Sequence, residues 1–417
     1  MKKIHNLRNG KVNKCQICGE KNLNKILSLG VQPPCDSLLL KSQLRKKENK
    51  FPLNFMFCEN CILGQVDYVV PKKKLFFSAY PYRSGITKTL VEKLYSTSDS
   101  IISKFGKAKG ELCVDIGSND GTLLKGFKRY GYSVLGVEAT NIAKIAIEDG
   151  IETIQSFFNE QVALKIISKK KKASLITATN VFAHVPNLYS TMKGIDLLLN
   201  NDGIFVSESH YLMNLIDTLQ YDSIYHEHLK YYSLNSLERL FNYYNFEVFD
   251  VEFIKNYGGS IRVFASRKGK FRKTKAVVEC LNNELKFKKE FKVNFEKFKN
   301  KVENNRIELR SLIKNYKDKG RTVIGVGCPG RCSTILNYCK INTTMMDYIA
   351  EQKSSLKLNK FLPGMKIPVI DEKEMFDNPP DLAILLSWHY SKEIISILRK
   401  KGFKSKILIP LPNPRLC

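Results

Sequence analysis

Four cysteines near the start of the chain are spaced as metal ligands. Cys15 and Cys18 form one C-x2-C pair, and Cys58 and Cys61 form a second. Each pair can place two thiolates on one turn, and two facing turns close a tetrahedral four-thiolate zinc site. Four thiolates leave no open coordination position, so the predicted zinc is structural. The alternative is four unrelated buried thiols.

A second group of reactive residue types lies in the middle of the chain. Tyr225, His226, Glu227 and His228 are consecutive, and further tyrosines lie nearby. Histidine titrates near neutral pH and can act as a general base, and phenol hydroxyls can stabilise an enolate. The alternative is that the histidines are satisfied by hydrogen bonds in a packed turn. The H-x-H spacing excludes an H-E-x-x-H zinc site.

A third group occupies a glycine-containing turn after a buried apolar segment. Leu112–Ile116 predicts a strand, and the following turn leads into an apolar helix start. The glycines let the backbone turn tightly and approach a ligand closely. We expect the turn to supply five cofactor-binding residues: Asp115, Gly117, Asn119, Asp120 and Gly121.

Two cofactors suit such a turn, a dinucleotide or S-adenosylmethionine (SAM). Glu138 follows the next predicted strand, at 133–137, where a carboxylate can accept both ribose hydroxyls of a nucleoside. The glycine spacing is G-x-x-x-G rather than G-x-G-x-x-G. Asp115 and Asp120 would repel a pyrophosphate but can hold the ammonium of a methionine moiety. These features favour SAM.

The elements that must position these groups alternate between helix and strand. A helix is predicted over Lys88–Phe105, and further strands are predicted at 174–179 and 203–208. This alternation predicts a parallel sheet with helices on both faces, in which ligands bind at the carboxyl ends of the strands. Asn180 follows one of these strands and is placed at the cofactor pocket.

A second α/β unit is predicted behind the first, with strands at 322–327, 345–350, 382–387 and 406–411. Residues 325–330 match G-x-G-x-x-G, and Glu351 follows at a distance suited to ribose, which alone would suggest a dehydrogenase. A proline inside that turn and the earlier cofactor site argue against a second redox cofactor. One amphipathic helix, packed on its own domain, is predicted from an aromatic stripe: Phe287, Phe291, Phe295, Phe298 and Val302.

Composition bounds the remaining possibilities. The 417 residues predict two or three domains, which we place at 1–75, 76–266 and 267–417. The formal charge of +28 is spread over the chain, so a lysine-rich solvated surface is favoured over a nucleic-acid-binding stripe. No apolar run suits a membrane span, and no signal peptide is recognised. Eleven cysteines without such a signal indicate thiols or metal ligands in the cytoplasm.

The chain resembles the sugar C-methyltransferases of deoxysugar and branched-sugar biosynthesis over nearly its full length. The similarity rests on both C-x2-C pairs and on segments 80–82, 115–121, 180–186, 221–229 and 257–262. It is looser toward the end, at 362–364, 367–368 and Trp388. The Tyr-x-Glu-His element at 225–228 is its most specific part. The resemblance implies a class I SAM methyltransferase fold between a zinc-binding domain and a Rossmann-like domain.

The resemblance also implies roles for individual residues. His228 would be the base, Glu227 its partner and Tyr225 a stabilising donor, with His226 held in reserve. Either Tyr80 or Tyr82 would be a second tyrosine at the site. The enolate of the substrate would then attack the methyl group of SAM.

The rear domain is implied to hold the nucleotide part of the substrate, with Arg331 near phosphate and Glu351 at the same ligand. His184 is assigned either to a ligand or to a helix cap, and Arg262 either to a phosphate or to a pair on a strand edge. The chain departs from the family at 331–332, where a Lys-Gly pair is usual, and at Tyr257, where His is common.

The implied reaction is methylation of a nucleotide-diphosphate 4-keto-deoxysugar at a carbon next to the ketone, namely C3. The expected partner is this small molecule, with no nucleic acid and no membrane, and the protein is expected to be a monomer or homodimer. The alternatives are a methyltransferase with another acceptor (a sugar hydroxyl or RNA), a non-catalytic nucleotide-sugar-binding protein, and a dehydrogenase that uses the rear glycine turn.

Overall fold

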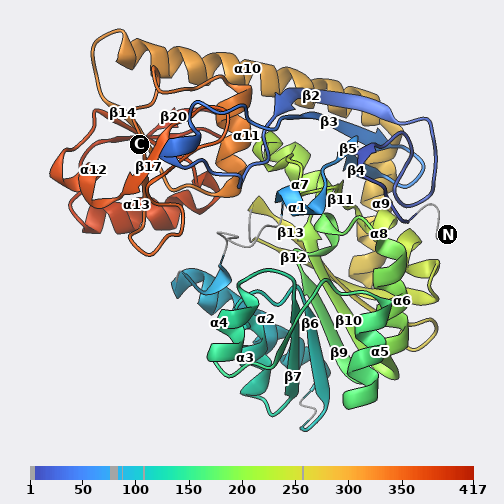
Figure 1. Ribbon diagram of the computed structural model, residues 1–417. Helices are drawn as coiled ribbons and strands as arrows, with labels where there is room; N and C mark the ends of the chain where they lie inside the picture. The colour runs from blue at the N-terminus through green and yellow to red at the C-terminus, as the bar shows by residue number, and fades with distance from the viewer. Residues whose placement is uncertain (1–4, 76–82, 87, 107–108, 256–257) are drawn as a thin grey trace.

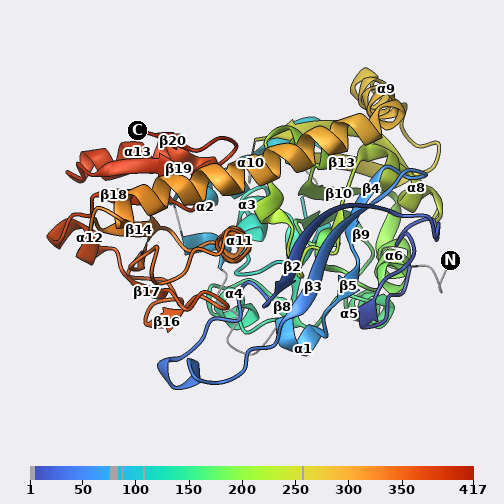
Figure 2. The same ribbon diagram turned by 90° about the horizontal axis from the view of Figure 1, so that it is seen from above.

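The computed structural model describes residues 5–75, 83–86, 88–106, 109–255 and 258–417. Among the described residues, three larger β-sheets occupy three regions of the molecule, and a two-stranded sheet pairs β1 with β5 (Figure 1). The long helix α10 (Phe291–Lys317) runs from the rear domain to the N-terminal sheet, as both views show (Figures 1 and 2). None of the described helices is long and apolar enough to cross a membrane.

The central sheet has seven strands in the order β12-β13-β10-β9-β6-β7-β8. Strand β13 runs antiparallel to both of its neighbours, and the remaining pairings are parallel. The predicted α/β sheet is therefore confirmed, except that the antiparallel strand β13 makes it a mixed sheet rather than a wholly parallel one. Its strands are β6 (Leu112–Ile116), β7 (Ser133–Glu138), β8 (Thr153–Gln155), β9 (Ala173–Thr179), β10 (Leu199–His210), β12 (Phe246–Ile254) and β13 (Ser260–Arg267).

Helices cover both faces of the central sheet (Figure 1). Buried side chains of α2 and α3 pack on one face, and those of α5, α6 and α8 pack on the other. Apolar strand residues therefore face a helix layer on each side, as a parallel sheet requires. The helices are α2 (Lys88–Phe105), α3 (Thr122–Lys128), α4 (Ala143–Glu148), α5 (Glu160–Lys169), α6 (Leu188–Leu198), α7 (Leu212–Asp217) and α8 (Leu234–Asn242).

The N-terminal sheet has the order β11-β4-β3-β2. Its strand β11 (Lys230–Tyr231) comes from the central domain, directly after His228, and pairs antiparallel with β4. The zinc-binding region is thus joined to the chain segment that carries the predicted base. The other elements here are β1 (Gly10–Lys11), β2 (Asn24–Gln32), β3 (Phe51–Cys58), β4 (Leu63–Val66), β5 (Tyr68–Val69) and α1 (Lys72–Leu75).

The rear sheet has the order β16-β17-β15-β14-β18-β19-β20, with antiparallel strands at both edges. The strand predicted at 345–350 begins only at Ile349, because Asn342 accepts the backbone amides of the preceding turn and holds it out of the sheet. The elements are β14 (Val323–Val326), β15 (Ile349–Glu351), β16 (Lys360–Phe361), β17 (Pro368–Asp371), β18 (Leu382–Leu385), β19 (Lys406–Ile409), β20 (Arg415–Leu416), α11 (Gly330–Tyr338), α12 (Lys373–Asp377) and α13 (Ser391–Lys400).

The aromatic stripe predicted as one helix is divided between two. Helix α9 (Lys275–Lys289) ends before Glu290, whose φ of −112° interrupts the helix, and α10 begins at Phe291. The stripe also packs beyond its own domain, because the ring of Phe57 on β3 lies 5.4 Å from Phe291 and 4.8 Å from Phe295. The sequence pattern has the right period, but it does not show which surface the stripe covers.

Candidate active site and zinc site

The four cysteines predicted to bind zinc lie together. Their sulfur atoms are all within 4.8 Å of one another, with 3.3 Å between Cys15 and Cys61 and 3.7 Å between Cys18 and Cys58. A tetrahedral zinc ion with bonds of about 2.3 Å separates its sulfurs by about 3.8 Å, so this donor set fits a closed zinc site. Hydrogen bonds from the neighbouring thiols, that of Cys15 first, lower the pKa of Cys18 and favour the thiolate that zinc binds.

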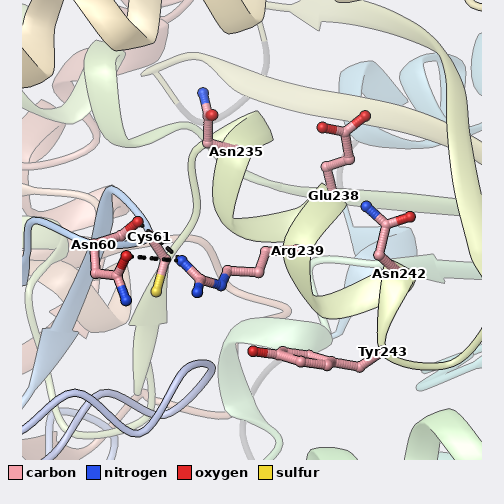
Figure 3. Close-up of a pocket in the computed structure, with 7 residues that line it drawn as sticks. All are labelled: Asn60, Cys61, Asn235, Glu238, Arg239, Asn242 and Tyr243. Carbon is pink, nitrogen blue, oxygen red and sulfur yellow. Dashed lines mark hydrogen bonds between the residues drawn. The ribbon is translucent and has the colours of Figure 1, made fainter.

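A surface hollow borders the zinc site. Figure 3 shows Arg239 of α8 reaching toward Asn60, whose backbone carbonyl and side-chain oxygen it contacts at 3.1 and 3.0 Å. The guanidinium therefore braces the second cysteine turn. No histidine is among the residues that line the hollow, so we do not place the reaction there. These residues are Asn60, Cys61, Asn235, Glu238, Arg239, Asn242 and Tyr243.

The turn after β6 has the geometry expected for close approach to a ligand. Gly117 has φ of +71°, and a Cβ atom there would overlap Val181, so only glycine suits the position. Gly121, with φ of +73°, is the residue before the first turn of α3. Glu138 ends β7 and accepts the backbone amides of Asn119 and Thr140 at 3.0 and 2.7 Å. A carboxylate has about four acceptor positions, so Glu138 keeps capacity for a ribose hydroxyl.

Asp115 and Asp120 have different surroundings. Burial raises the pKa of Asp115 to about 7, and its carboxyl accepts the hydroxyl of Thr177 at 2.6 Å. Asp120 pairs with Arg83 at 3.1 Å and accepts the amide of Gly85 at 2.7 Å. Asp120 therefore fixes the segment directly after residues 76–82. The predicted Tyr80 and Tyr82 lie outside the described residues, as does Tyr257.

Two unsatisfied polar atoms support a ligand at the carboxyl edge of the central sheet. The side-chain oxygen of Asn180 and the hydroxyl of Ser118 are buried and have no hydrogen-bond partner among the described residues. Asn180 has φ of +57°, and its amide donates to the carbonyl of Glu208 at 2.7 Å. Buried polar groups are normally hydrogen-bonded, so these two atoms fit a polar cofactor such as SAM.

His228 lies in a buried cluster of rings. Its Nε2 is 2.8 Å from the hydroxyl of Tyr225, and the two ring centres are 4.1 Å apart. The imidazoles of His184 and His210 lie 4.8 and 5.1 Å from it, both edge-on. Burial, and then the charges that these two imidazoles could carry, lower the pKa of His228 well below its usual value. His228 is therefore neutral at pH 7, as a general base must be.

The neighbouring groups are held in fixed protonation states as well. Burial lowers the pKa of His184 to about 4 and that of His210 to about 3. Burial also raises the pKa of Tyr225 well above 10, so this phenol keeps its proton and can donate. The cluster thus combines neutral imidazoles with a hydrogen-bond donor, a suitable setting for removing a proton from carbon.

Glu227 and His226 flank His228 in sequence but face other elements. The Glu227 carboxylate accepts the thiol of Cys35 at 3.4 Å, and the carboxylate of Asp36 lies in the same cluster. Its predicted role as the partner of His228 stays a prediction. The Nε2 atom of His226 lies 3.3 and 3.2 Å from the carbonyls of Phe51 and Pro52 on β3. These contacts favour His226 as a brace between the two domains.

Arg331 brings a cation from the rear domain to this cluster. It lies in the first turn of α11 and is buried. Burial is the main cause of the lowered pKa of both His210 and His228, and the charge of Arg331 contributes to it at both imidazoles. Asp222 lies in the same electrostatic environment, where the charge of Arg331 opposes the effect of burial on its pKa. A phosphate near Arg331 would therefore be close to the predicted base.

The glycine turn of the rear domain, at residues 325–330, is in contact with side chains of this chain. Glu351 accepts the backbone amide of Cys328 at 2.7 Å, and a Cβ atom on Gly330 would come within 2.9 Å of Asp36. The ammonium of Lys357 pairs with Asp36 at 2.9 Å and donates to the carbonyl of Cys328 at 2.8 Å. The backbone groups of Cys328 in this turn are therefore already bonded to Glu351 and Lys357, which argues against the dehydrogenase alternative.

Arg262 is engaged inside the central domain. It contacts Glu208 at 2.8 Å, Glu252 at 3.1 Å and the hydroxyl of Thr97 at 2.9 Å. Glu208 and Arg262 are direct partners across β10 and β13. Of the two roles considered for Arg262, these contacts favour the pair on neighbouring strands over a phosphate contact.

Sequence reasoning missed several members of the histidine cluster. His210 closes β10 two residues beyond the predicted strand end, and it could have been found as a histidine at a carboxyl edge. Asp222 accepts the indole N–H of Trp388 at 2.8 Å, and His389 lies beside Trp388 with its pKa lowered by burial and then by Arg331. No local pattern links these residues, because they come from domains far apart in the chain.

The strand order of the central sheet and the turn after β6 are those of a class I SAM methyltransferase. A family model described as a methyltransferase domain matches residues 90–251. A C-methyltransferase C-terminal domain matches residues 255–412, and a zinc-binding domain matches residues 15–76. The protein is thus a SAM-dependent methyltransferase with a zinc-binding N-terminal domain.

The chain belongs to the C-methyltransferase family. It is 31% identical over 410 residues to the C-methyltransferase NovU of Streptomyces niveus, and the match covers 97% of each chain. Among solved structures, magnesium protoporphyrin IX methyltransferase of Synechocystis PCC 6803 is 10% identical, with a TM-score of 0.35 over 45% of this chain and 90% of the other. A SAM-dependent methyltransferase of Anabaena variabilis is 14% identical, with a TM-score of 0.33 over 46% of this chain and 100% of the other.

Proposed function

We propose that this C-methyltransferase acts on a nucleotide-diphosphate 4-keto-deoxysugar and methylates the ring carbon next to the ketone, at C3. The observation that carries the proposal is the buried contact between His228 and Tyr225, next to the carboxyl end of β10 and beside the cation of Arg331. Carbon becomes a nucleophile only when a base removes its proton, and a neutral imidazole beside a phenol donor supplies that chemistry.

In this mechanism His228 removes the proton from the ring carbon. Burial raises the pKa of Tyr225, so its hydroxyl keeps its proton, and in the tautomer with an unprotonated Nε2 this hydroxyl donates to that nitrogen, which we assign as the base. Once Nε2 takes the substrate proton, Tyr225 is placed to donate to the enolate oxygen instead. When bound, SAM supplies the methyl group that the enolate carbon takes. The proton remains on His228 until it passes to solvent.

The charges around the cluster suit an anionic substrate. Burial is the main cause of the low pKa of His228 and Arg331 a smaller one, and a diphosphate near that guanidinium would offset the part due to its charge. Substrate binding is therefore expected to raise the basicity of His228 at the moment when it acts. A neutral acceptor would leave the imidazole with its low pKa and hence a weaker base.

The acceptor is tested by incubating the protein with SAM and a panel of nucleotide-diphosphate 4-ketosugars. Mass spectrometry should show the gain of one methyl group, and NMR should place that methyl on carbon. The gain should be lost in His228→Ala, whereas His226→Gln should retain it. A methyl group on oxygen, or no methylated sugar while SAM still binds, would replace this proposal with the hydroxyl or RNA alternative.

A further inference from the structure

A buried lysine connects the zinc site to the histidine cluster. Lys230 follows His228 by two residues and is among the largest fully buried side chains. Its ammonium donates to the side-chain oxygen of Gln16 at 3.1 Å and to the carbonyl of Val185 at 2.7 Å. Gln16 lies between Cys15 and Cys18, and Val185 directly follows His184 (whose ring contacts His228). The Lys230 side chain therefore contacts a neighbour of the cysteine ligands, Gln16, and a neighbour of His184, Val185.

Gln16 binds the same segment a second time. Its side-chain amide donates to the carbonyl of Leu229, and its backbone amide donates to the side chain of Gln65 at 3.0 Å. Gln65 pairs with Lys230 across β4 and β11, which lie side by side in Figure 1. The amide of Leu229 in turn donates to the carbonyl of Ala183 at 2.8 Å. The first cysteine turn is thus bonded to the residues next to His228 and His184.

The charge of Lys230 needs an explanation, because both of its hydrogen-bond acceptors are neutral. Among the described residues, no carboxylate lies within ion-pair distance of its ammonium. An isolated buried charge is costly to the folded state unless an opposite charge compensates it. Burial lowers the pKa of Lys230 to about 7, and the charge of Cys15 opposes that shift. Four thiolates around Zn²⁺ carry a net charge of about −2, which would favour the ammonium further. The filled zinc site therefore supplies the counter-charge.

We propose that Lys230 and Gln16 are positioning residues through which the zinc site fixes the arrangement of His184 and His228. The inference rests on the proposed role of His228. It means that the zinc site stabilises the histidine cluster as well as the N-terminal domain. Loss of zinc or of the ammonium should displace the 183–185 turn and the 228–229 segment together, because both are bonded to the same group.

The test compares Lys230→Met, which keeps the length of the side chain and removes its charge, with the wild-type protein. We expect kcat to fall roughly tenfold to a hundredfold, with KM for SAM and for the sugar within about twofold. Zinc should be lost faster to a chelator. In histidine-labelled protein, the imidazole signals of His184 and His228 should shift, and the pKa of His184 should rise because Lys230 contributes to lowering it.

The matched control is Lys104→Met, since Lys104 pairs with Asp250 and Glu252 on β12 instead. It should leave the imidazole signals and the zinc loss unchanged. If Lys230→Met does not fold, Gln16→Met removes the side-chain bonds from residue 16 to Lys230 and to the Leu229 carbonyl, and the same measurements are made on it. A folded variant with wild-type kcat and wild-type imidazole signals would overturn the inference, as would failure of both variants to fold with zinc present. The imidazole signals are read without turnover, so they decide this inference even if another residue proves to be the base.

Discussion

At the residue scale, the contact between Tyr225 and His228 tells most about the proposed reaction. Its hydroxyl lies 2.8 Å from Nε2, and burial keeps its pKa well above 10. It can therefore act as a donor both in the resting site and toward an enolate. Replacing one such preorganised donor typically costs about 10²–10³-fold in kcat.

We therefore predict that Tyr225→Phe lowers kcat by about 10²-fold and changes SAM affinity little. The ring is retained, so its packing against His228 persists. Steady-state kinetics and SAM titration measure the two effects. Tyr130→Phe, at a partly buried tyrosine that donates to Asp99, is the matched control and should keep full activity. Equal loss of kcat in both variants would remove Tyr225 from the mechanism.

The buried histidines predict a dependence of stability on pH. The pKa values of His184, His210 and His226 are lowered by burial to about 4, 3 and 4. In the unfolded chain these groups titrate near about 6.5, so below that pH the unfolded state binds more protons than the folded state. Stability is therefore present above about pH 6.5 and is lost as the pH falls toward 4. Urea unfolding midpoints that stay constant between pH 7 and pH 4.5 would contradict these pKa values.

At the residue scale, contacts between residues close in sequence could be predicted. Contacts between residues far apart in sequence could not. Tyr225 and His228 are three positions apart, and a tight turn brings them into contact, as the sequence pattern indicates. The approach of Arg331 to this pair depends on the docking of the rear domain. Cys35 also contacts Glu227, although 192 positions separate them.

At the scale of elements, β10 and β13 are held by a buried ion pair. Arg262 and Glu208 have side chains that are 4% and 2% exposed, and they face each other across the two strands. Strand β10 also carries His210 at its end. The pair therefore supports the strand that carries His210 of the histidine cluster.

We predict that Arg262→Leu destabilises the protein by about 3–5 kcal/mol, because it leaves the Glu208 carboxylate buried without its partner. The free energy of unfolding in urea measures this effect. Adding Glu208→Met should restore part of the loss, since the uncompensated charge is then removed. Arg129→Leu, which breaks a half-exposed pair with Asp99, should change stability by only about 0–1 kcal/mol. Similar losses for the two single variants would mean that burial does not determine the cost.

The hydrophobic periodicity of the sequence predicted the bounds of helices and strands better than it predicted how they pack together. Helix α2 has the bounds that the sequence pattern predicts, and the eight strands predicted for the central and rear sheets agree within about four residues. Six further strands of these sheets were not predicted: β8, β12, β13, β16, β17 and β20. The strands of the N-terminal sheet were not predicted, because β11 joins them from a distant segment. The break at Glu290 was also missed, since the apolar period continues through it.

At the scale of the whole molecule, one hydrophobic core joins the N-terminal and rear domains. It includes Phe55 and Phe57 of β3, Phe295 of α10 and Ile335 of α11. Helix α10 crosses the top of the molecule and contributes to both regions (Figures 1 and 2). The zinc domain and the rear domain are therefore expected to unfold together.

We predict that Phe295→Ala destabilises both regions by about 3–5 kcal/mol, because it opens a cavity in this shared core. Tyrosine fluorescence and zinc release should report a single transition that shifts to lower urea. Phe253→Ala, at a ring that is more than half exposed, should cost less than about 1 kcal/mol. Zinc release that stays at its wild-type midpoint in Phe295→Ala would show that the two domains unfold independently.

The proposed methylation depends on the removal of a proton from carbon by His228. Hydrogen exchange at that carbon measures this step directly. The wild-type protein is incubated in deuterated buffer with S-adenosylhomocysteine and a nucleotide-diphosphate 4-ketosugar, so that no methyl group can be transferred. We predict deuterium at the carbon next to the ketone, with a rate about 10²–10⁴-fold lower in His228→Gln. Absence of exchange in the wild-type protein, together with methylation of the same sugar on oxygen when SAM is supplied, would contradict the proposed reaction.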